Sequence, residues 1–142
     1  MSRKIFNFFA GAGLLALLGV APLPAQTGST MIVAQVPFAF VVGDRTLPAG
    51  EYVVRPGGPL GLMIQSTAGK ATIFTLPLPI EGSRVEPHPW LVFKQYGDTY
   101  FLSELWKAGN NAGHKLRMSS LERELAQGKA TPEVRSIVAQ QR

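Results

Sequence analysis

The segment from Phe38 to Val54 places the strongest constraint on what this chain can fold into. Residues 38–42 alternate larger and smaller apolar side chains, which is the period-2 pattern of a strand with one heavier face. Gly43-Asp44 interrupts this run, and Leu47 to Gly50 has the composition of a type I turn, with proline second and glycine fourth. Residues 51–54 then return to strand-forming side chains. Two strands and two turns in so short a stretch indicate a mainly β fold.

The N-terminal residues have the pattern of an export signal. Arg3 and Lys4 precede an uncharged apolar run, Phe8 to Val20, and the small Ala25 closes a proline-containing segment. Spanning a hydrocarbon core ~30 Å thick needs about 20 apolar residues, so this run is too short for a typical membrane span. It matches the apolar region of a signal peptide better than the alternative, an uncleaved anchor.

We therefore expect residues 1–25 to be a signal peptide that is cleaved between Ala25 and Gln26, and residues 26–30 to be a flexible leader. The exported protein would be periplasmic or extracellular. The remainder has the size of one domain, and the chain contains no cysteine, so no disulfide assists folding.

Positive charge is concentrated near the C-terminus. Residues 107–142 contain seven basic and three acidic side chains. An anionic envelope polymer, a lipid or an envelope protein would be a more natural partner for this excess than nucleic acid in an exported protein, but the interpretation we favour is a solvated, soluble tail. We predict no nucleic-acid partner and no transmembrane span in the mature chain.

Apolar runs bounded by turn residues predict about six strands. They lie near residues 31–42, 51–56, 60–66, 71–77, 90–96 and 99–106. Pro37 interrupts the first of them and predicts a sheet edge or a bulge, because proline cannot donate to a ladder. Residues 77–89 contain four prolines and predict a crossover, a functional loop or a mobile one. The fold we expect is an antiparallel sandwich or small barrel.

Residues 90–106 predict a hairpin at the centre of the core. With Gly97-Asp98 as its two-residue turn, Phe93 would face Leu102, Gln95 would face Tyr100, and Trp90 would face Leu105. Both faces of this hairpin are apolar, so we expect each of them to be covered.

The C-terminal segment predicts one or two short helices. Ser119 and Glu122 form a capping box for a helix over 119–127, with an apolar face of Leu121 and Leu125. Thr131-Pro132 has the composition of a second helix start, over 132–140. We thus expect residues 31–128 to form a β-rich domain that includes the first helix. Residues 129–142 would then be a basic helical tail, weakly held and available to a partner.

Three stretches together carry a resemblance. They are Phe40 to Tyr52, with its Gly-Asp-x-x-Leu-Pro-Ala-Gly-Glu-Tyr sequence, Tyr96 to Trp106, and Ser120 to Leu125. In this combination the chain resembles short exported proteins of acidobacterial and other soil bacterial genomes. The resemblance implies export and a single β-rich domain. It brings no established activity and no catalytic residue.

No motif of the sequence predicts a chemical site. His88 and His114 each lack a second ligand at metal-binding spacing, and no Gly-x-Ser-x-Gly elbow is present. Asp44 and Asp98 each follow a glycine and have the role of turn formers. We therefore predict no catalytic, cofactor-binding or metal-binding residue.

Aromatic and β-branched side chains are the remaining candidates for contact with a ligand or partner. These are Trp90, Tyr96, Trp106, Val134, Ile137 and Val138. The function we favour is a non-enzymatic binding or assembly role in the cell envelope. The alternatives are a carrier of a small apolar ligand inside a barrel, and an enzyme with an unrecognised site that uses Glu104, His88 or His114.

Overall fold

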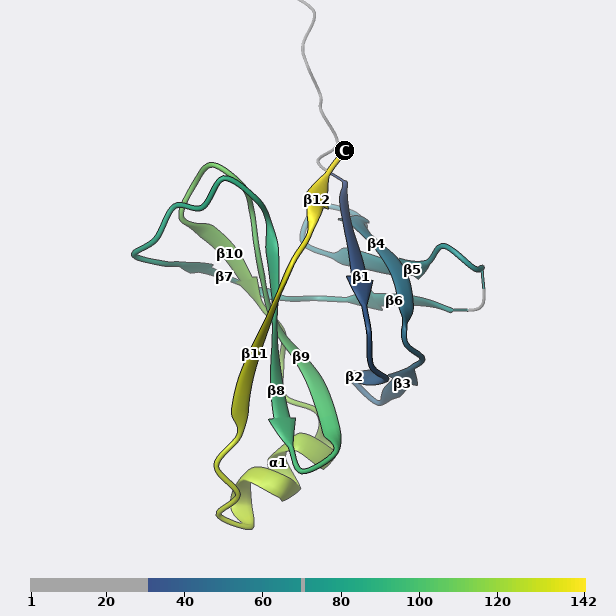
Figure 1. Cartoon of the computed structure of the whole chain (residues 1–142), viewed down its shortest axis with the longest axis vertical. Coiled ribbons are helices and arrows are strands. Elements are labelled where there is room, and N and C mark those ends of the chain that lie inside the picture. The colour runs from purple at the N-terminus through teal and green to yellow at the C-terminus, as the bar shows by residue number, and fades with distance from the viewer. Residues whose placement is uncertain (1–30, 70) are drawn as a thin grey trace, which may run out of the picture.

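The described part of the chain folds as two β-sheets packed face to face, with one short helix (Figure 1). The structure is a computed structural model that describes residues 31–69 and 71–142. Within them the fold is mainly β and sandwich-like, as predicted, and the strands do not close into a barrel. The predicted signal peptide, its cleavage site and the leader lie outside the described residues.

Five strands make the first sheet and seven make the second. The five-stranded sheet runs in the order β12 (Gln140–Gln141), β1 (Ile32–Val36), β4 (Gly50–Pro56), β5 (Leu62–Ser66) and β6 (Thr72–Thr75). The seven-stranded sheet runs in the order β11 (Glu133–Val138), β8 (Trp90–Tyr96), β9 (Thr99–Trp106), β10 (Ala112–Lys115) and β7 (Leu78–Glu81). The strands β2 (Phe40–Val42) and β3 (Arg45–Leu47) complete it, with β2 parallel to β9.

Pro37 marks a change of sheet. The strand β1 ends at Val36 in the five-stranded sheet, and β2 begins at Phe40 in the other. Because proline donates no hydrogen bond, it fits the connection between two ladders. The turn after β3 is anchored by the Tyr52 hydroxyl, which donates to the Pro48 carbonyl at 2.6 Å.

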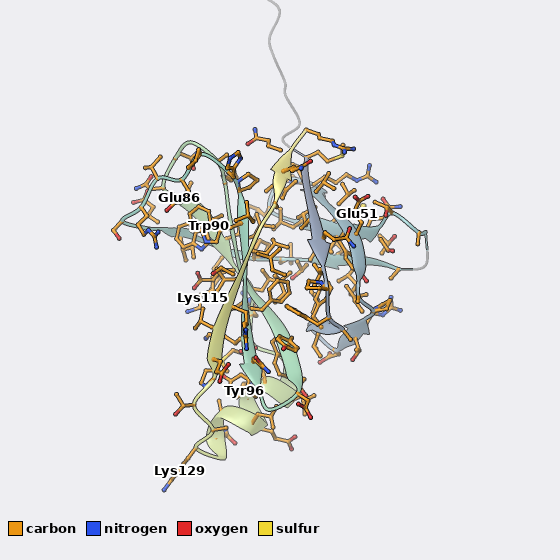
Figure 2. The ribbon with its side chains drawn as sticks, in the orientation of Figure 1. Glu51, Glu86, Trp90, Tyr96, Lys115 and Lys129 are labelled. Carbon is orange, nitrogen blue, oxygen red and sulfur yellow. The ribbon has the colours of Figure 1, made fainter. Side chains whose placement is uncertain are left out.

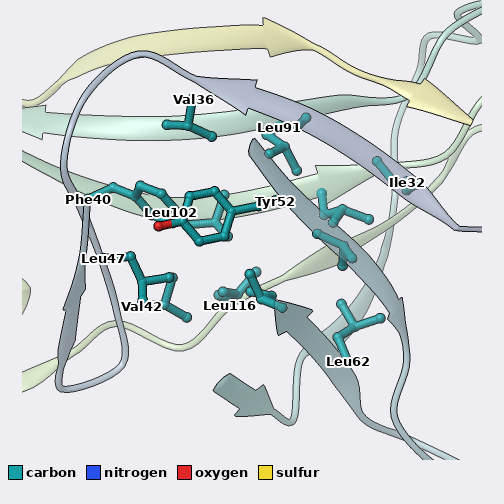
Figure 3. Packing of buried hydrophobic residues seen from close by; sticks show 14 of the residues in the cluster. Ile32, Val36, Phe40, Val42, Leu47, Tyr52, Leu62, Leu91, Leu102 and Leu116 are labelled. Atoms are coloured by element: carbon teal, nitrogen blue, oxygen red, sulfur yellow. The ribbon is translucent and has the colours of Figure 1, made fainter. Parts of the chain in front are cut away.

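The core fills the space between the two sheets (Figure 3). Phe40 lies between Tyr52 and Phe93, with ring centroids 5.0 and 5.4 Å apart and rings nearly perpendicular, a favourable aromatic geometry. Phe93 and Val36 are fully buried. Strands from both sheets contribute to one continuous apolar cluster.

The β8–β9 hairpin has the predicted turn but a different register at its far end. Phe93 faces Leu102 and Gln95 faces Tyr100, as predicted. Beyond these pairs Ser103 is the extra residue of a β-bulge, because Val92 pairs with Glu104. The predicted pairing of Trp90 with Leu105 is therefore wrong.

Because of the bulge, the tryptophans and leucines at this end of the hairpin have cross-strand partners that differ from the predicted ones. Trp90 pairs with Trp106, and Leu91 pairs with Leu105. The bulge thus turns Leu105 into the core and places Trp106 on the outer face of the seven-stranded sheet, the face away from the core.

The helix α1 (Ser120–Gln127) forms where the capping box predicted it, and the Ser119 hydroxyl accepts from the Glu122 amide at 3.0 Å. Its packing face differs from the prediction. Leu121 is 46% exposed, whereas Glu122 is 4% exposed and Leu125 packs on a small cluster of Val41, Tyr96 and Phe101.

The predicted second helix over 132–140 is wrong, since these residues form β11 and β12. A helix this short with a narrow apolar stripe has little to bury, whereas the free edge of β8 offers a full ladder to a β-branched segment. Pro132 is compatible with either outcome, because proline is also tolerated at a strand start.

Residues 129–142 are consequently no tail. The Ala139 amide donates to the Pro89 carbonyl on one flank at 2.8 Å. On the other flank, the Arg142 amide donates to the Met31 carbonyl at 2.8 Å. The chain end therefore runs along β8 and then along β1, so that it joins both sheets (Figure 1).

Besides β11 and β12, three strands were not predicted, namely β3, β7 and β10. The strand β7 lies in the proline-rich 77–89 segment and tolerates Pro79 because it is at a sheet edge. The strand β10 lies in a stretch rich in glycine and asparagine, a composition that favours loops. In the described part of the chain, no helix is long and apolar enough to cross a membrane.

Candidate functional site

A row of side chains crosses the outer face of the seven-stranded sheet. The pairing of its strands places side by side Val138, Trp90, Trp106, Gly113 and Ile80, which we call the tryptophan row. The two indole rings stack with centroids 5.5 Å apart and planes inclined by 11°. Five strands thus contribute to one aromatic and aliphatic surface.

Two glycines let the Trp106 ring lie flat on the sheet. A Cβ atom at Gly113 would come within 2.6 Å of the ring, and one at Gly82 within 2.8 Å. The indole nitrogen Nε1 donates to Glu104 Oε2 at 2.9 Å, which fixes the ring within its plane. Trp106 is therefore a rigid support for the ring of Trp90.

A hollow of about 270 Å³ opens beside Trp90. Its lining residues are Arg84, Glu86, Pro87, His88, Trp90, Ser136 and Val138, and we call it the Trp90 hollow. Figure 2 shows Glu86 and Trp90 on the same side of the molecule, away from the α1 end.

The polar groups of the Trp90 hollow come from the segment before β8 and from β11. Arg84 Nη2 and Glu86 Oε1 form an ion pair at 2.8 Å, and this pair is largely exposed. The Glu86 carbonyl accepts from the Gly109 amide at 2.8 Å, which holds the loop against the β9–β10 connection. An aromatic wall with a few polar groups around it is the usual composition of a small-molecule binding site.

The structure brings three of the six predicted contact residues together. Trp90, Trp106 and Val138 belong to the tryptophan row, and Val138 is 70% exposed. Val134 is 65% exposed on the same face, but it pairs with Lys94 and does not line the hollow.

The other two predicted residues do not face solvent. Ile137 pairs with Leu91 and packs against the core. Tyr96 is 6% exposed and lies beneath α1.

The sequence did not assign the polar half of the hollow to a binding site, although His88 was named for the enzyme alternative. Arg84, Glu86 and His88 lie in a proline-rich segment without periodicity, so only its length and its position before a strand could have drawn attention to it. Ser136 was not recognised because residues 132–140 were predicted to form a helix. Read as a strand, Val134, Ser136 and Val138 alternate onto one face.

The alternative of an enzyme required a histidine close to a carboxylate in a cleft. His88 and Glu86 line the same hollow, but no hydrogen bond joins either histidine to a carboxylate within the described residues. Glu104 accepts instead from Trp106. Among residues 31–69 and 71–142, no three His, Asp or Glu side chains are grouped to hold a metal ion.

The opposite end of this face contains a buried carboxyl group. Glu122 Oε1 has no hydrogen-bond partner among the described residues. Burial raises the pKa of the Glu122 carboxyl above its ordinary value, while Lys94 and Lys115 act in the opposite direction. Burial and then the charge of Glu122 raise the pKa of Tyr96. Glu122 belongs to α1 and Tyr96 lies under that helix, and neither residue lines the Trp90 hollow (Figure 2).

Comparisons of this chain with protein-family models, with curated proteins and with solved structures gave no match, so the candidate function rests on the geometry of the Trp90 hollow.

Proposed function

We propose that this chain is an exported, non-enzymatic binding domain of the cell envelope, and that the Trp90 hollow holds a saccharide chain of that envelope. The single observation that carries the proposal is the Trp90 ring. It is held flat against Trp106 at the wall of a hollow that also contains an ion pair, an imidazole and a hydroxyl.

Saccharides are amphipathic in a way that suits this hollow. Each pyranose ring has a face of C–H groups that can lie on an indole, and hydroxyl groups at its edge that donate and accept hydrogen bonds. Glu86 offers an acceptor, Arg84 offers donors, and Ser136 offers both. An elongated chain of sugars would extend along the tryptophan row toward Ile80.

The rigidity of the site also supports binding. The Trp106 ring is fixed by Gly82, Gly113 and Glu104 before any ligand arrives. Little side-chain entropy is then lost on association, and this reduces the cost of forming the complex.

Export is supported by the basic, apolar and small-residue pattern of residues 1–25 and by the resemblance to short exported bacterial proteins. Intact-mass measurement of the protein secreted by an expressing bacterium should give a chain that starts at Gln26. Recovery of membrane-bound protein that retains residues 1–25 would contradict this part of the proposal.

The binding experiment can use the protein's own fluorescence. The chain has two tryptophans, and both lie in the tryptophan row. Titration with β-1,4-linked N-acetylglucosamine oligomers should change the tryptophan emission in a saturable way. Trp90→Ala should weaken binding, measured by calorimetry, at least about tenfold, which corresponds to ~1.4 kcal/mol.

The two exposed valines of β11 provide a matched control. Val138→Ala should weaken binding several-fold, whereas Val134→Ala should leave it unchanged, because only Val138 lines the hollow. Absence of binding to these oligomers and to purified envelope polysaccharide would overturn the saccharide assignment. A protein partner that depends on both valines would instead indicate an assembly role.

A further inference from the structure

A second cavity lies at the mouth between the two sheets. It is a groove of about 430 Å³, which we call the inter-sheet groove, and this volume is in the range of small-molecule sites. Residues from β1, β4 and β5 form one side, and residues from β7, β10 and the β9–β10 connection form the other. No described residue lines both this groove and the Trp90 hollow.

The floor of the inter-sheet groove is apolar. Ile32, Val54 and Leu62 reach it from the five-stranded sheet, where the core opens toward solvent. Leu60, at the rim, is 81% exposed. Four prolines form much of the remaining wall, and proline offers no backbone donor. A ligand portion that contacts this floor must itself be apolar.

The loop that borders the groove is held in place before any ligand binds. The Gly57 amide donates to the Gly61 carbonyl at 2.9 Å and closes the loop. Cβ atoms at these two glycines would come within 2.7 and 2.2 Å of the Phe74 ring, so the loop lies directly on that ring. The groove is therefore largely preformed.

One end of the groove is polar and cationic. His114 Nδ1 is buried and has no hydrogen-bond partner within the described residues. Burial, and then the nearby charge of Lys107, lowers the pKa of His114, so its imidazole is neutral at pH 7 and can present one N–H donor. Arg55 also borders the groove, but its Nη2 donates to Gln65 Oε1 at 3.2 Å.

The charged side chains that line the inter-sheet groove itself are basic, whereas Glu81 lines an adjacent hollow together with Lys107 and His114. None of the described residues that line the groove is acidic. A ligand with an anionic head would neutralise the charge of Lys107 and could accept a hydrogen bond from the His114 imidazole, whereas a neutral lipid would leave the Lys107 charge uncompensated.

We propose that the inter-sheet groove binds a long-chain carboxylate. Its carboxylate group accepts hydrogen bonds from the Lys107 ammonium and the His114 imidazole. Its alkyl chain packs on Ile32, Val54 and Leu62, and the side chain of Leu60 covers the alkyl chain. This site acts independently of the Trp90 hollow and goes beyond the saccharide binding proposed above.

The test is calorimetric titration of the full mature protein with dodecanoate, with dodecanol as the uncharged comparison. Dodecanoate should bind at least tenfold more tightly than dodecanol. Lys107→Gln should remove most of this preference, and Leu60→Asn should weaken the binding of both ligands. Lys129→Gln, which changes a distant exposed lysine near the end of α1, should have no effect (Figure 2).

Trp90→Ala separates this proposal from the preceding one, because it should leave dodecanoate binding intact while it weakens saccharide binding at least about tenfold. Equal affinity for dodecanoate and dodecanol, no effect of Lys107→Gln, or no binding of dodecanoate by the unsubstituted protein would each overturn the carboxylate site. Circular dichroism of each variant would verify that it is folded.

Discussion

The outer face of the β8–β9 ladder has aromatic side chains at both of its ends, but only one end is covered by another element of the fold. At one end α1 covers Tyr96 and Phe101, which are 6% and 2% exposed. At the other end Trp90 and Trp106 are only partly buried, and a hollow opens beside them. The covered end therefore contributes to stability, and the open end is available for binding.

The difference lies in what each end has to cover it. The described residues contain one helix, and its Ser119 cap and short length place it over the turn end of the hairpin. The strand β11 runs beside both ends but lies at the edge of the same sheet, so it extends the outer face without covering it.

The largest effect is expected on removal of β11 and β12, which border the open end. Deletion of residues 129–142 takes away the ladder on β8, the contact with β1 and the buried Ala139. We expect a loss of more than about 5 kcal/mol, comparable with the whole stability of a domain, and hence no cooperative thermal transition. A tail as weakly held as the sequence indicated would change the melting temperature by only a few degrees on deletion, on the order of 1 kcal/mol. A result of that size would show that the two sheets hold together without this segment.

The next effect separates the two ends directly. Phe101→Ala at the covered end leaves a cavity under α1 and should cost about 3–5 kcal/mol in urea denaturation. Trp90→Ala at the open end should cost about 1 kcal/mol, because its ring is partly exposed already. If the two variants lost equal free energy of unfolding, the distinction between a stabilising end and a binding end would not hold.

How far the sequence predicted this arrangement depends on the local signals. The turn at Gly97-Asp98 and the cap at Ser119 are specified by neighbouring residues, and both are confirmed. The Ser103 bulge has no such signal, since it depends on packing across the two sheets. Without the bulge Trp106 would not face Trp90.

The β11 segment illustrates the same limit. Thr131-Pro132 is compatible with a helix start and with the start of an edge strand, so tertiary contacts with β8 decided between them. The polar groups of the Trp90 hollow meet only through that strand and an aperiodic loop, so half of the candidate site could not be predicted.

A smaller, pH-dependent effect is expected from Glu122 at the covered end. Its pKa in the folded state is raised above the ordinary value of 4.5, so the ionised form is disfavoured by folding. Stability attributable to this group is therefore full below that value and is lost as the pH rises through the folded-state pKa. Lys94, Lys115 and Tyr96 are the ionisable groups that act on it or respond to it.

Glu122→Gln should accordingly stabilise the protein at neutral pH and have little effect below pH 4.5. Urea denaturation of both proteins across this range would measure the difference. Destabilisation by the substitution at neutral pH would indicate that the carboxylate is ionised and favourably paired with the lysines.

The smallest effect is expected at the exposed valines. Val138→Ala and Val134→Ala should each change the free energy of unfolding by no more than ~0.5 kcal/mol, because both side chains are mostly in solvent. Thermal melts should nearly coincide with that of the unsubstituted protein. A large loss for Val138→Ala alone would mean that the open end is part of the structural core.

The central claim, that one end of this face serves binding and the other serves stability, is tested most directly by NMR of the ¹⁵N-labelled mature protein during saccharide titration. The two tryptophans give two indole N–H signals. The account predicts that the Trp90 indole shifts most and the Trp106 indole less, because its N–H remains bonded to Glu104. The amides of Tyr96 and Phe101 beneath α1 should stay in place. Shifts confined to the α1 end, with both indole signals unchanged, would contradict the account.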